Sequence, residues 1–121
     1  HAYYIISQTP ILGLSDGEVE IVANVVRYHR KAPPDPSHEA YRALDDRDRD
    51  RVRSLASILR VADALDHDHR QRVSAVRVKA RGGELRLTLR TRGDVTLDAW
   101  SVEDKGDLFR EEFGLKPVLA R

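Results

Sequence analysis

The spacing of apolar residues changes once along this 121-residue chain, at Val73, and this change divides the fold. Before Val73 the apolar residues recur at three- and four-residue steps, as in the run from Val52 to Leu65, which is typical of amphipathic helices. After Val73 they alternate with polar residues, as in Leu85 to Leu89, which is typical of half-buried strands. The sequence therefore predicts an α+β fold, with an all-helical part at residues 1–72 and a small α+β part at residues 73–121.

Prolines and helix-capping residues indicate where the helices of the first part begin and end. Residues 1–8 form a short helix, or the last turns of a longer one, that Thr9-Pro10 ends. Ser15 and Glu18 have the spacing of a capping box, so a helix begins there and runs to about Lys31. Pro33, Pro34 and Pro36 make residues 32–43 a stiff loop. Asp45 or Asp46 then caps a helix that extends to about His67.

Glycines place the turns of the second part. Gly82-Gly83 lies between two alternating runs and predicts a hairpin, and Gly93-Asp94 predicts a second turn before a third strand at residues 95–100. A helix follows from Ser101 and stops at Gly114, and residues 115–119 form a last strand. The predicted order is β-β-β-α-β. We expect the rings of the second part to pack between the sheet and the last helix; they are Trp100, Phe109 and Phe113.

The charge balance and the residue content narrow the classes of function that the chain can have. The formal net charge is +1, which requires neither nucleic acid nor an anionic membrane as a partner. The chain has no Cys, which excludes disulfides and thiolate metal sites. No apolar run approaches the ~20 residues that span a bilayer. The chain has no Met and opens as if within a helix, so we expect it to be a fragment.

Cationic side chains gather at the ends of two predicted helices. They are His29, Arg30 and Lys31 after the first long helix, and His69, Arg70 and Arg72 after the second. Guanidinium and imidazolium groups bind phosphate oxygens strongly, which makes these six residues candidates for a polyanion site. The alternative is that they only terminate the two helices, where cations suit the dipole.

Three polar groups lie on or beside apolar helix faces: His1, His29 and Asp63. In a helical bundle such groups converge on one interior point, as metal ligands do. Two imidazoles and a carboxylate suit a transition metal or phosphate chemistry. The alternative is three satisfied structural groups, and Asp63 in particular needs a partner if it is buried.

Four segments together resemble a known family over nearly the whole chain. They are H-A-Y-Y-I-I at residues 1–6, V-V-R-Y-H-R-K-A-P-P at 25–34, L-A-S-I-L-R-V-A-D-A-L-D-H-D-H-R-Q at 55–71 and D-K-G-D-L-F-R-E-E-F-G at 104–114. Their order and spacing are similar to those of the C-terminal half of the exopolyphosphatase/guanosine pentaphosphate phosphatase family.

The resemblance implies an HD-like helical domain followed by a small β-rich subdomain. It implies that Asp63 corresponds to the final aspartate of the HD pattern, and that His1 and His29 occupy positions of accessory histidines in related HD domains. The His-Asp dyad that defines an HD phosphohydrolase does not precede Asp63 in this chain. In this family catalysis belongs to two N-terminal actin-like domains, so no catalytic residue is assigned here.

We therefore expect the chain to be a cytoplasmic accessory domain that is inactive alone and needs no cofactor of its own. The parent enzyme is expected to hydrolyse inorganic polyphosphate or guanosine pentaphosphate with Mg²⁺, and the domain to contribute substrate binding and homodimerisation. Two alternatives stay open: a fragment of a metal-dependent HD-type phosphohydrolase, with His1, His29 and Asp63 as ligands, and an interaction module without a ligand.

Overall fold

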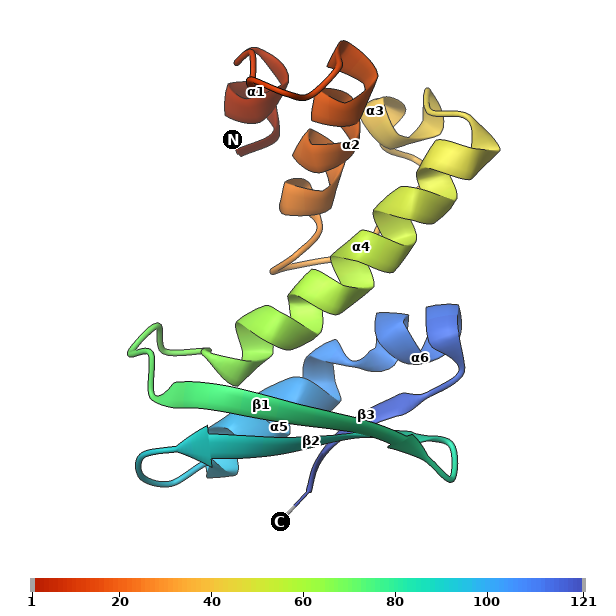
Figure 1. The fold of residues 1–121 in the computed structure, drawn as a ribbon. Helices are drawn as coiled ribbons and strands as arrows, with labels where there is room; N and C mark the ends of the chain where they lie inside the picture. The colour runs from red at the N-terminus through yellow and green to blue at the C-terminus, as the bar shows by residue number, and fades with distance from the viewer. Residues whose placement is uncertain (1, 121) are drawn as a thin grey trace. The chain divides into compact units, whose positions relative to one another are not determined.

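The computed structural model describes residues 2–120, which form six helices and a three-stranded sheet (Figure 1). In chain order the elements are α1 (Ala2–Ser7), α2 (Asp16–Arg27), α3 (Glu39–Arg42), α4 (Asp46–Leu65), β1 (Val73–Arg81), β2 (Glu84–Thr91), α5 (Thr96–Lys105), α6 (Asp107–Phe113) and β3 (Lys116–Ala120). The predicted α+β class is confirmed.

The chain divides into two compact units, and the division falls within α4. Residues up to Ala56 belong to the N-terminal unit, and residues from Ser57 belong to the C-terminal unit. Strand β1 begins at Val73, where the apolar period changes. The domain boundary between residues 72 and 73 stays a prediction, as does the HD-like character of the helical part.

In the N-terminal unit, a capping box fixes the start of α2. Ser15 Oγ accepts the Glu18 N–H at 3.2 Å, and the Glu18 carboxylate accepts the Ser15 N–H at 2.9 Å, as the sequence predicts. The backbone N–H of Ser15 also holds the pKa of Glu18 below its usual value, because it binds the ionised form.

Helix α2 ends at Arg27 rather than at the predicted Lys31, and the C-cap residue Tyr28, with φ −102° and ψ 7°, leaves the helical conformation. Tyr28 is 1% exposed, and its hydroxyl lies 2.6 Å from Nδ1 of His38 in the following loop. Asp45 accepts the Asp48 N–H at 2.8 Å and so caps the start of α4, as predicted.

The sheet of the C-terminal unit has the order β1-β2-β3. Strands β1 and β2 are antiparallel and joined at Gly82 and Gly83, whose φ values of 60° and 76° suit a tight hairpin turn. The predicted hairpin is confirmed. Strand β3 runs parallel to β2, and α5 and α6 form the connection between them.

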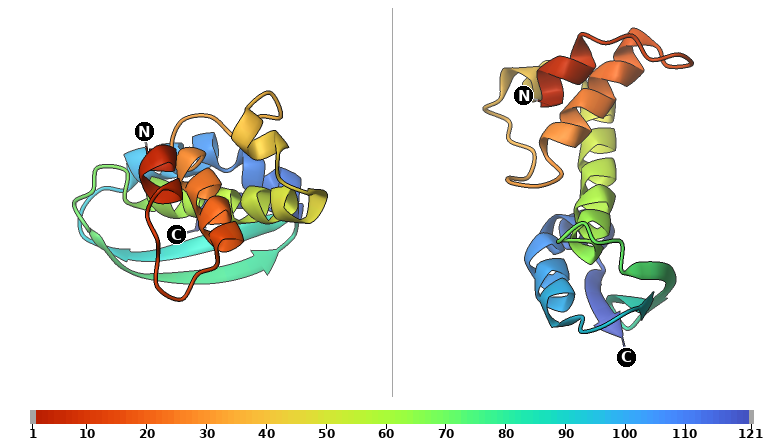
Figure 2. Two further views of the ribbon diagram at one scale, coloured as in Figure 1. Left: turned by 90° about the horizontal axis from the view of Figure 1, so that it is seen from above. Right: turned by 90° about the vertical axis from the view of Figure 1, so that its left-hand side faces the viewer.

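Helices cover one face of this sheet (Figure 2). The buried cluster joins α4, β2, α5 and α6, and Leu85, Leu115 and Leu119 pack around it. Its members are Val61, Ala64, Leu87, Val102 and Phe109. The opposite face of the sheet presents the alternate residues of each strand, which are mostly exposed.

The third predicted strand, at residues 95–100, is wrong, because Val95 is the N-cap of α5 and the following residues belong to that helix. Asp94 Oδ1 accepts the N–H of Thr96 at 2.9 Å and its hydroxyl at 2.6 Å, which turns the chain into a helix. Asp98 and Val102, four residues apart, are buried, whereas Leu97 is 63% exposed. The order is therefore β-β-α-α-β, and the apparent alternation of this short segment has no structural role.

The prediction for the aromatic rings is confirmed for one of the three. Phe109 is buried, and Phe113 contacts its ring at a centroid distance of 4.6 Å while remaining 44% exposed. Trp100 is 66% exposed, because it lies on the outer side of α5. The seam between sheet and helices is thus filled mainly by aliphatic side chains and Phe109.

Candidate functional site

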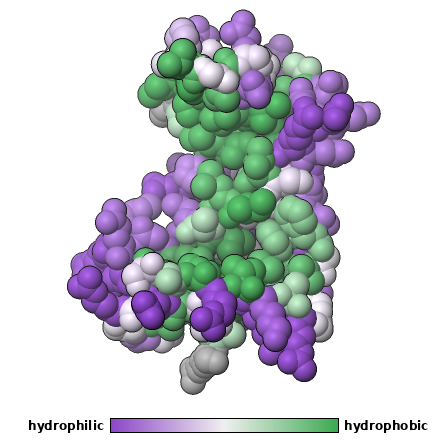
Figure 3. Space-filling view, in the orientation of Figure 1, coloured by the Kyte–Doolittle hydropathy of each residue, from purple (hydrophilic) through white to green (hydrophobic). Residues whose placement is uncertain are grey.

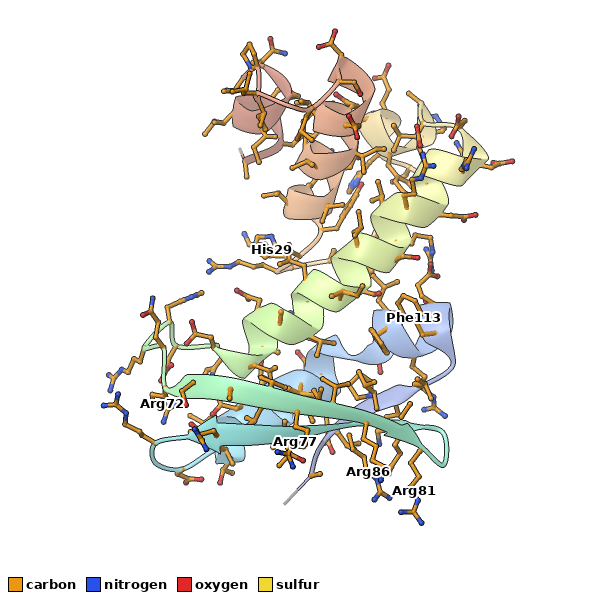
Figure 4. The ribbon with its side chains drawn as sticks, in the orientation of Figure 1. His29, Arg72, Arg77, Arg81, Arg86 and Phe113 are labelled. Atoms are coloured by element: carbon orange, nitrogen blue, oxygen red, sulfur yellow. The ribbon has the colours of Figure 1, made fainter. Side chains whose placement is uncertain are left out.

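The first group of predicted cations follows α2 in the N-terminal unit. His29 is half-buried, and its Nδ1 donates to the carbonyl oxygen of Val26 at 2.5 Å, which leaves Nε2 for an external partner. Arg30 and Lys31 are exposed. Figure 4 shows His29 beside the end of α2. The structure therefore places all three cations together on one segment.

These cations line a shallow pocket of about 340 Å³ that contains no carboxylate. The pocket is lined by Ala2, Tyr3, Tyr4, Val26, Arg27, His29, Arg30 and Lys31. Four cationic or ionisable nitrogen groups and two phenol rings meet there. Guanidinium and ammonium groups bind phosphate oxygens, and phenol rings offer a face for stacking. The pocket is chemically suited to an anionic ligand.

The tyrosine at the wall of this pocket has a carboxylate behind it. The Tyr3 hydroxyl donates a short hydrogen bond to Glu20 Oε1. Burial and this bond together raise the pKa of Tyr3 to about 12, because both disfavour the phenolate. Arg27 lies over the ring of Tyr28, 5.7 Å from its centroid. The bond to Glu20 fixes the Tyr3 side chain in place, and the raised pKa keeps its hydroxyl protonated.

The second group of predicted cations lies in the charged loop, residues 66–72, between α4 and β1. His69 and Gln71 have φ values of 57° and 54°, a left-handed conformation that costs non-glycine residues about 1 kcal/mol or more each. Aspartates hold this backbone. Asp66 Oδ1 accepts the Gln71 N–H at 2.9 Å, and Asp68 Oδ1 accepts the Arg70 N–H at 3.3 Å.

Arg72 is engaged within the protein. Its Nη2 lies 3.0 Å from Asp68 Oδ2 and 3.7 Å from Asp98 Oδ2, and its Nη1 donates to the Asp94 carbonyl at 3.2 Å. Asp98 is 3% exposed and accepts a hydrogen bond from His67 Nδ1 at 2.7 Å. Arg72 and His67 therefore anchor the loop to α5, which gives Arg72 a structural role that the sequence does not reveal.

Hydrogen bonds and nearby cations lower the pKa values of two aspartates in this region. Partial desolvation raises the pKa of Asp68, but the Arg70 N–H and the charges of Arg72, His67 and Arg70 outweigh it and lower the pKa. The Thr96 hydroxyl and N–H lower the pKa of Asp94. Arg70 itself points outward, with 78% of its side chain exposed and its Nε 3.9 Å from Asp68.

The residues of the HD pattern fall in different parts of the chain. His1 lies outside the described residues, His29 belongs to the N-terminal unit, and Asp63 is a half-buried residue of α4 in the C-terminal unit. Within residues 2–120, no three His, Cys, Asp or Glu side chains are grouped to hold a metal ion.

The sequence reasoning did not single out the cations of the strands. Arg and Lys occupy every second position in R-V-K-A-R at residues 77–81, and Arg86 and Arg90 continue the pattern on β2. Such alternation usually marks a solvated face of a strand, but here three consecutive outward positions of β1 are cationic. Figure 4 shows Arg77, Arg81 and Arg86 extending from the strands, away from the helices.

Comparison with known proteins gives one family. The model described as Ppx/GppA phosphatase, domain III, matches residues 1–108, most of the chain. The resemblance drawn from the four sequence segments is thereby confirmed. No curated protein gives a significant match. Among residues 2–120, no helix combines the length and the apolar character that a membrane span needs.

Proposed function

The chain belongs to the Ppx/GppA phosphatase family through its domain III, and from this membership we propose that it is an accessory domain that holds a polyanionic substrate without hydrolysing it. The observation that carries the proposal is the carboxylate-free pocket after α2, where Arg27, His29, Arg30 and Lys31 meet. A pocket lined by several cations favours a ligand of high negative charge.

The chemistry of the lining supports phosphate as the ligand. Arg27 and Arg30 present planar forks that match two phosphate oxygens, and Lys31 adds a mobile point charge. His29 has its Nδ1 fixed on the Val26 carbonyl, so its Nε2 is the ring nitrogen left to contact phosphate. Tyr3 and Tyr4 limit the pocket on the side of α1.

The charged loop adds cations in the C-terminal unit. Arg70 and His69 are its exposed members, and we assign to them the direct contacts with the polyanion. Arg72 acts by positioning, because its contacts with Asp68 and Asp98 fix the loop backbone. In this respect the proposal differs from the sequence prediction, which gives Arg72 a direct contact.

The parent enzyme completes the proposed function. Inorganic polyphosphate and guanosine pentaphosphate are the substrates that the family suggests, and hydrolysis is assigned to actin-like domains of the same protein. The HD-like character of the helical part and a role in homodimerisation belong to the same proposal.

The test is binding of linear polyphosphate to the 121-residue chain, measured together with phosphate release. We expect saturable binding at low salt and release at the level of the buffer blank. Arg30→Ala/Lys31→Ala should weaken binding more than Arg42→Ala/Arg47→Ala, a change of equal charge at exposed positions of the same unit. Absence of binding, or phosphate release that persists through repurification, would contradict the proposal.

A further inference from the structure

The uncovered face of the sheet carries a cluster of cations. Strand register places the side chains of alternate residues on this face, opposite the face packed on α4, α5 and α6. We call it the basic sheet face; its cationic residues are Arg77, Lys79, Arg81, Arg86, Arg90 and Lys116. All six are exposed. In Figure 3 hydrophilic side chains extend from the lower edge of the C-terminal unit, where the strands lie.

Charge is segregated onto this face. It holds six of the 21 Lys and Arg residues of the chain but only one of the 20 Asp and Glu residues, Glu84. The chain as a whole is nearly neutral, with a formal charge of +1. A local excess of this kind arises from placement rather than from general basicity, and it concentrates anions at one surface.

Most of these cations lack an intramolecular counterion. Arg86 Nε lies 3.2 Å from Glu84 Oε1. Among the residues that the structure describes, Arg77, Lys79 and Arg81 form no ion pair or side-chain hydrogen bond with a carboxylate, and Arg90 forms none either. Their charges are therefore available to an external ligand.

The register even sets like charges opposite each other. Lys79 pairs with Arg86 across β1 and β2. Directly opposed side chains have Cβ atoms about 4.5–5.5 Å apart, and like charges at this separation destabilise a sheet. A bound polyanion removes this repulsion, because its charges lie between the cations.

We propose that the basic sheet face binds linear inorganic polyphosphate through its phosphate oxygens. Neighbouring cations lie about 6.6–6.8 Å apart along a strand and about 4.8 Å apart across strands, so an extended polyphosphate contacts several at once. No aromatic residue lies among the outward positions of β1, β2 and β3. Single-stranded nucleic acids are bound with stacking of bases on aromatic rings, and this face offers none.

This surface extends the proposed function and rests on it, since polyphosphate is the substrate class that the family suggests. It differs in location from the pocket after α2 and from the charged loop. The two proposals fail differently: loss of all polyphosphate binding overturns both, whereas binding that ignores the strand cations overturns only this one.

The experiment compares two triple variants of the 121-residue chain by equilibrium titration with linear polyphosphate. Arg77→Ala/Lys79→Ala/Arg81→Ala removes three exposed cations from β1. Its matched control is Arg42→Ala/Arg47→Ala/Arg110→Ala, at exposed helical positions. Exposed charge contacts contribute up to about 1 kcal/mol each, so the β1 variant should bind about tenfold or more weakly, and the control within about threefold.

A charge-preserving variant and a second ligand complete the test. Arg77→Lys/Arg81→Lys keeps the charge and should bind within about threefold of the unmodified chain, since a lysine still neutralises phosphate. Equal losses in the β1 triple variant and its control would overturn the proposal. A single-stranded oligonucleotide of matched charge should bind more weakly than polyphosphate, and equal or tighter binding would overturn the assignment to bare phosphate.

Discussion

Replacing Asp98 by Ala should destabilise the C-terminal unit by about 1–2 kcal/mol. Asp98 is 3% exposed and accepts a hydrogen bond from His67 Nδ1 at 2.7 Å, and such a bond to a charged group contributes about 1.5–3 kcal/mol. The 3.7 Å contact with the half-buried Arg72 adds less than about 1 kcal/mol. Two effects of the substitution offset part of this loss in the free energy of unfolding. Alanine has a better helix propensity than aspartate by about 0.5 kcal/mol, and removing the buried carboxylate also removes its larger desolvation cost.

Urea unfolding measures this change. Trp100 is the only tryptophan and lies in α5, so its fluorescence reports on the C-terminal unit. With an m value of about 2 kcal/mol/M, the midpoint should fall by about 0.5–1 M. Glu103→Ala, an exposed change of equal charge on the same helix, should alter the free energy of unfolding by less than about 0.5 kcal/mol.

A double-mutant cycle identifies the cause. If the bond to His67 carries the effect, His67→Ala/Asp98→Ala should show a coupling of about 1 kcal/mol. Equal midpoints for Asp98→Ala and Glu103→Ala would refute the reasoning, as would a coupling near zero. The contact would then contribute nothing net, and another interaction would have to hold the charged loop.

Three further changes test the packing and the electrostatics. Gly106→Ala should lower the free energy of unfolding by about 1–3 kcal/mol in urea titrations, since its Cβ would lie 2.8 Å from the Val102 carbonyl oxygen. Gly17→Ala in α2 should raise it by about 0.5–1 kcal/mol, because nothing lies within 4 Å of the added Cβ. In an alkaline absorbance titration Tyr3 should ionise with a pKa of about 12, and Glu20→Gln should lower that pKa. Because the folded pKa is raised, the stability that Tyr3 contributes is present below its ordinary pKa of 10.0 and is lost as the pH rises through about 12.

Local signals in the sequence predicted much of the fold. The capping box at Ser15, the hairpin at Gly82-Gly83 and the helix stop at Gly114 are each fixed by contacts within a few residues. Such contacts can be read from spacing alone. The change of period at Val73 predicted the start of β1, since apolar spacing follows from which face is buried.

The third strand was wrongly predicted because a six-residue alternation is too short to distinguish a strand from a helix. The decisive contact is long-range: Asp98 is buried against His67, 31 residues away. A carboxylate that faces inward looks like an outward polar residue when only the sequence is considered. The same contacts explain why Arg72, which the sequence suggests as a ligand-binding cation, instead fixes the loop to α5.

The candidate site was predicted in part. His29, Arg30 and Lys31 share one segment and one pocket, because they are adjacent in the chain. The basic sheet face was not identified, because each strand alone shows ordinary alternation. Only the register that sets Lys79 opposite Arg86 shows that the cations of two strands share one face.

The salt dependence of polyphosphate binding tests the central claim most directly, namely that clustered cations on a nearly neutral chain hold a polyanion. The affinity of the 121-residue chain for linear polyphosphate is measured between about 50 mM and about 200 mM salt. Each phosphate neutralised on a single-stranded polyanion contributes about −0.7 to the slope of log affinity against log salt. We expect a slope of about −4 or steeper, as six neutralised phosphates give, made less steep by about two units in the Arg77→Ala/Lys79→Ala/Arg81→Ala variant. A slope near zero, or no binding at the lowest salt, would contradict the account.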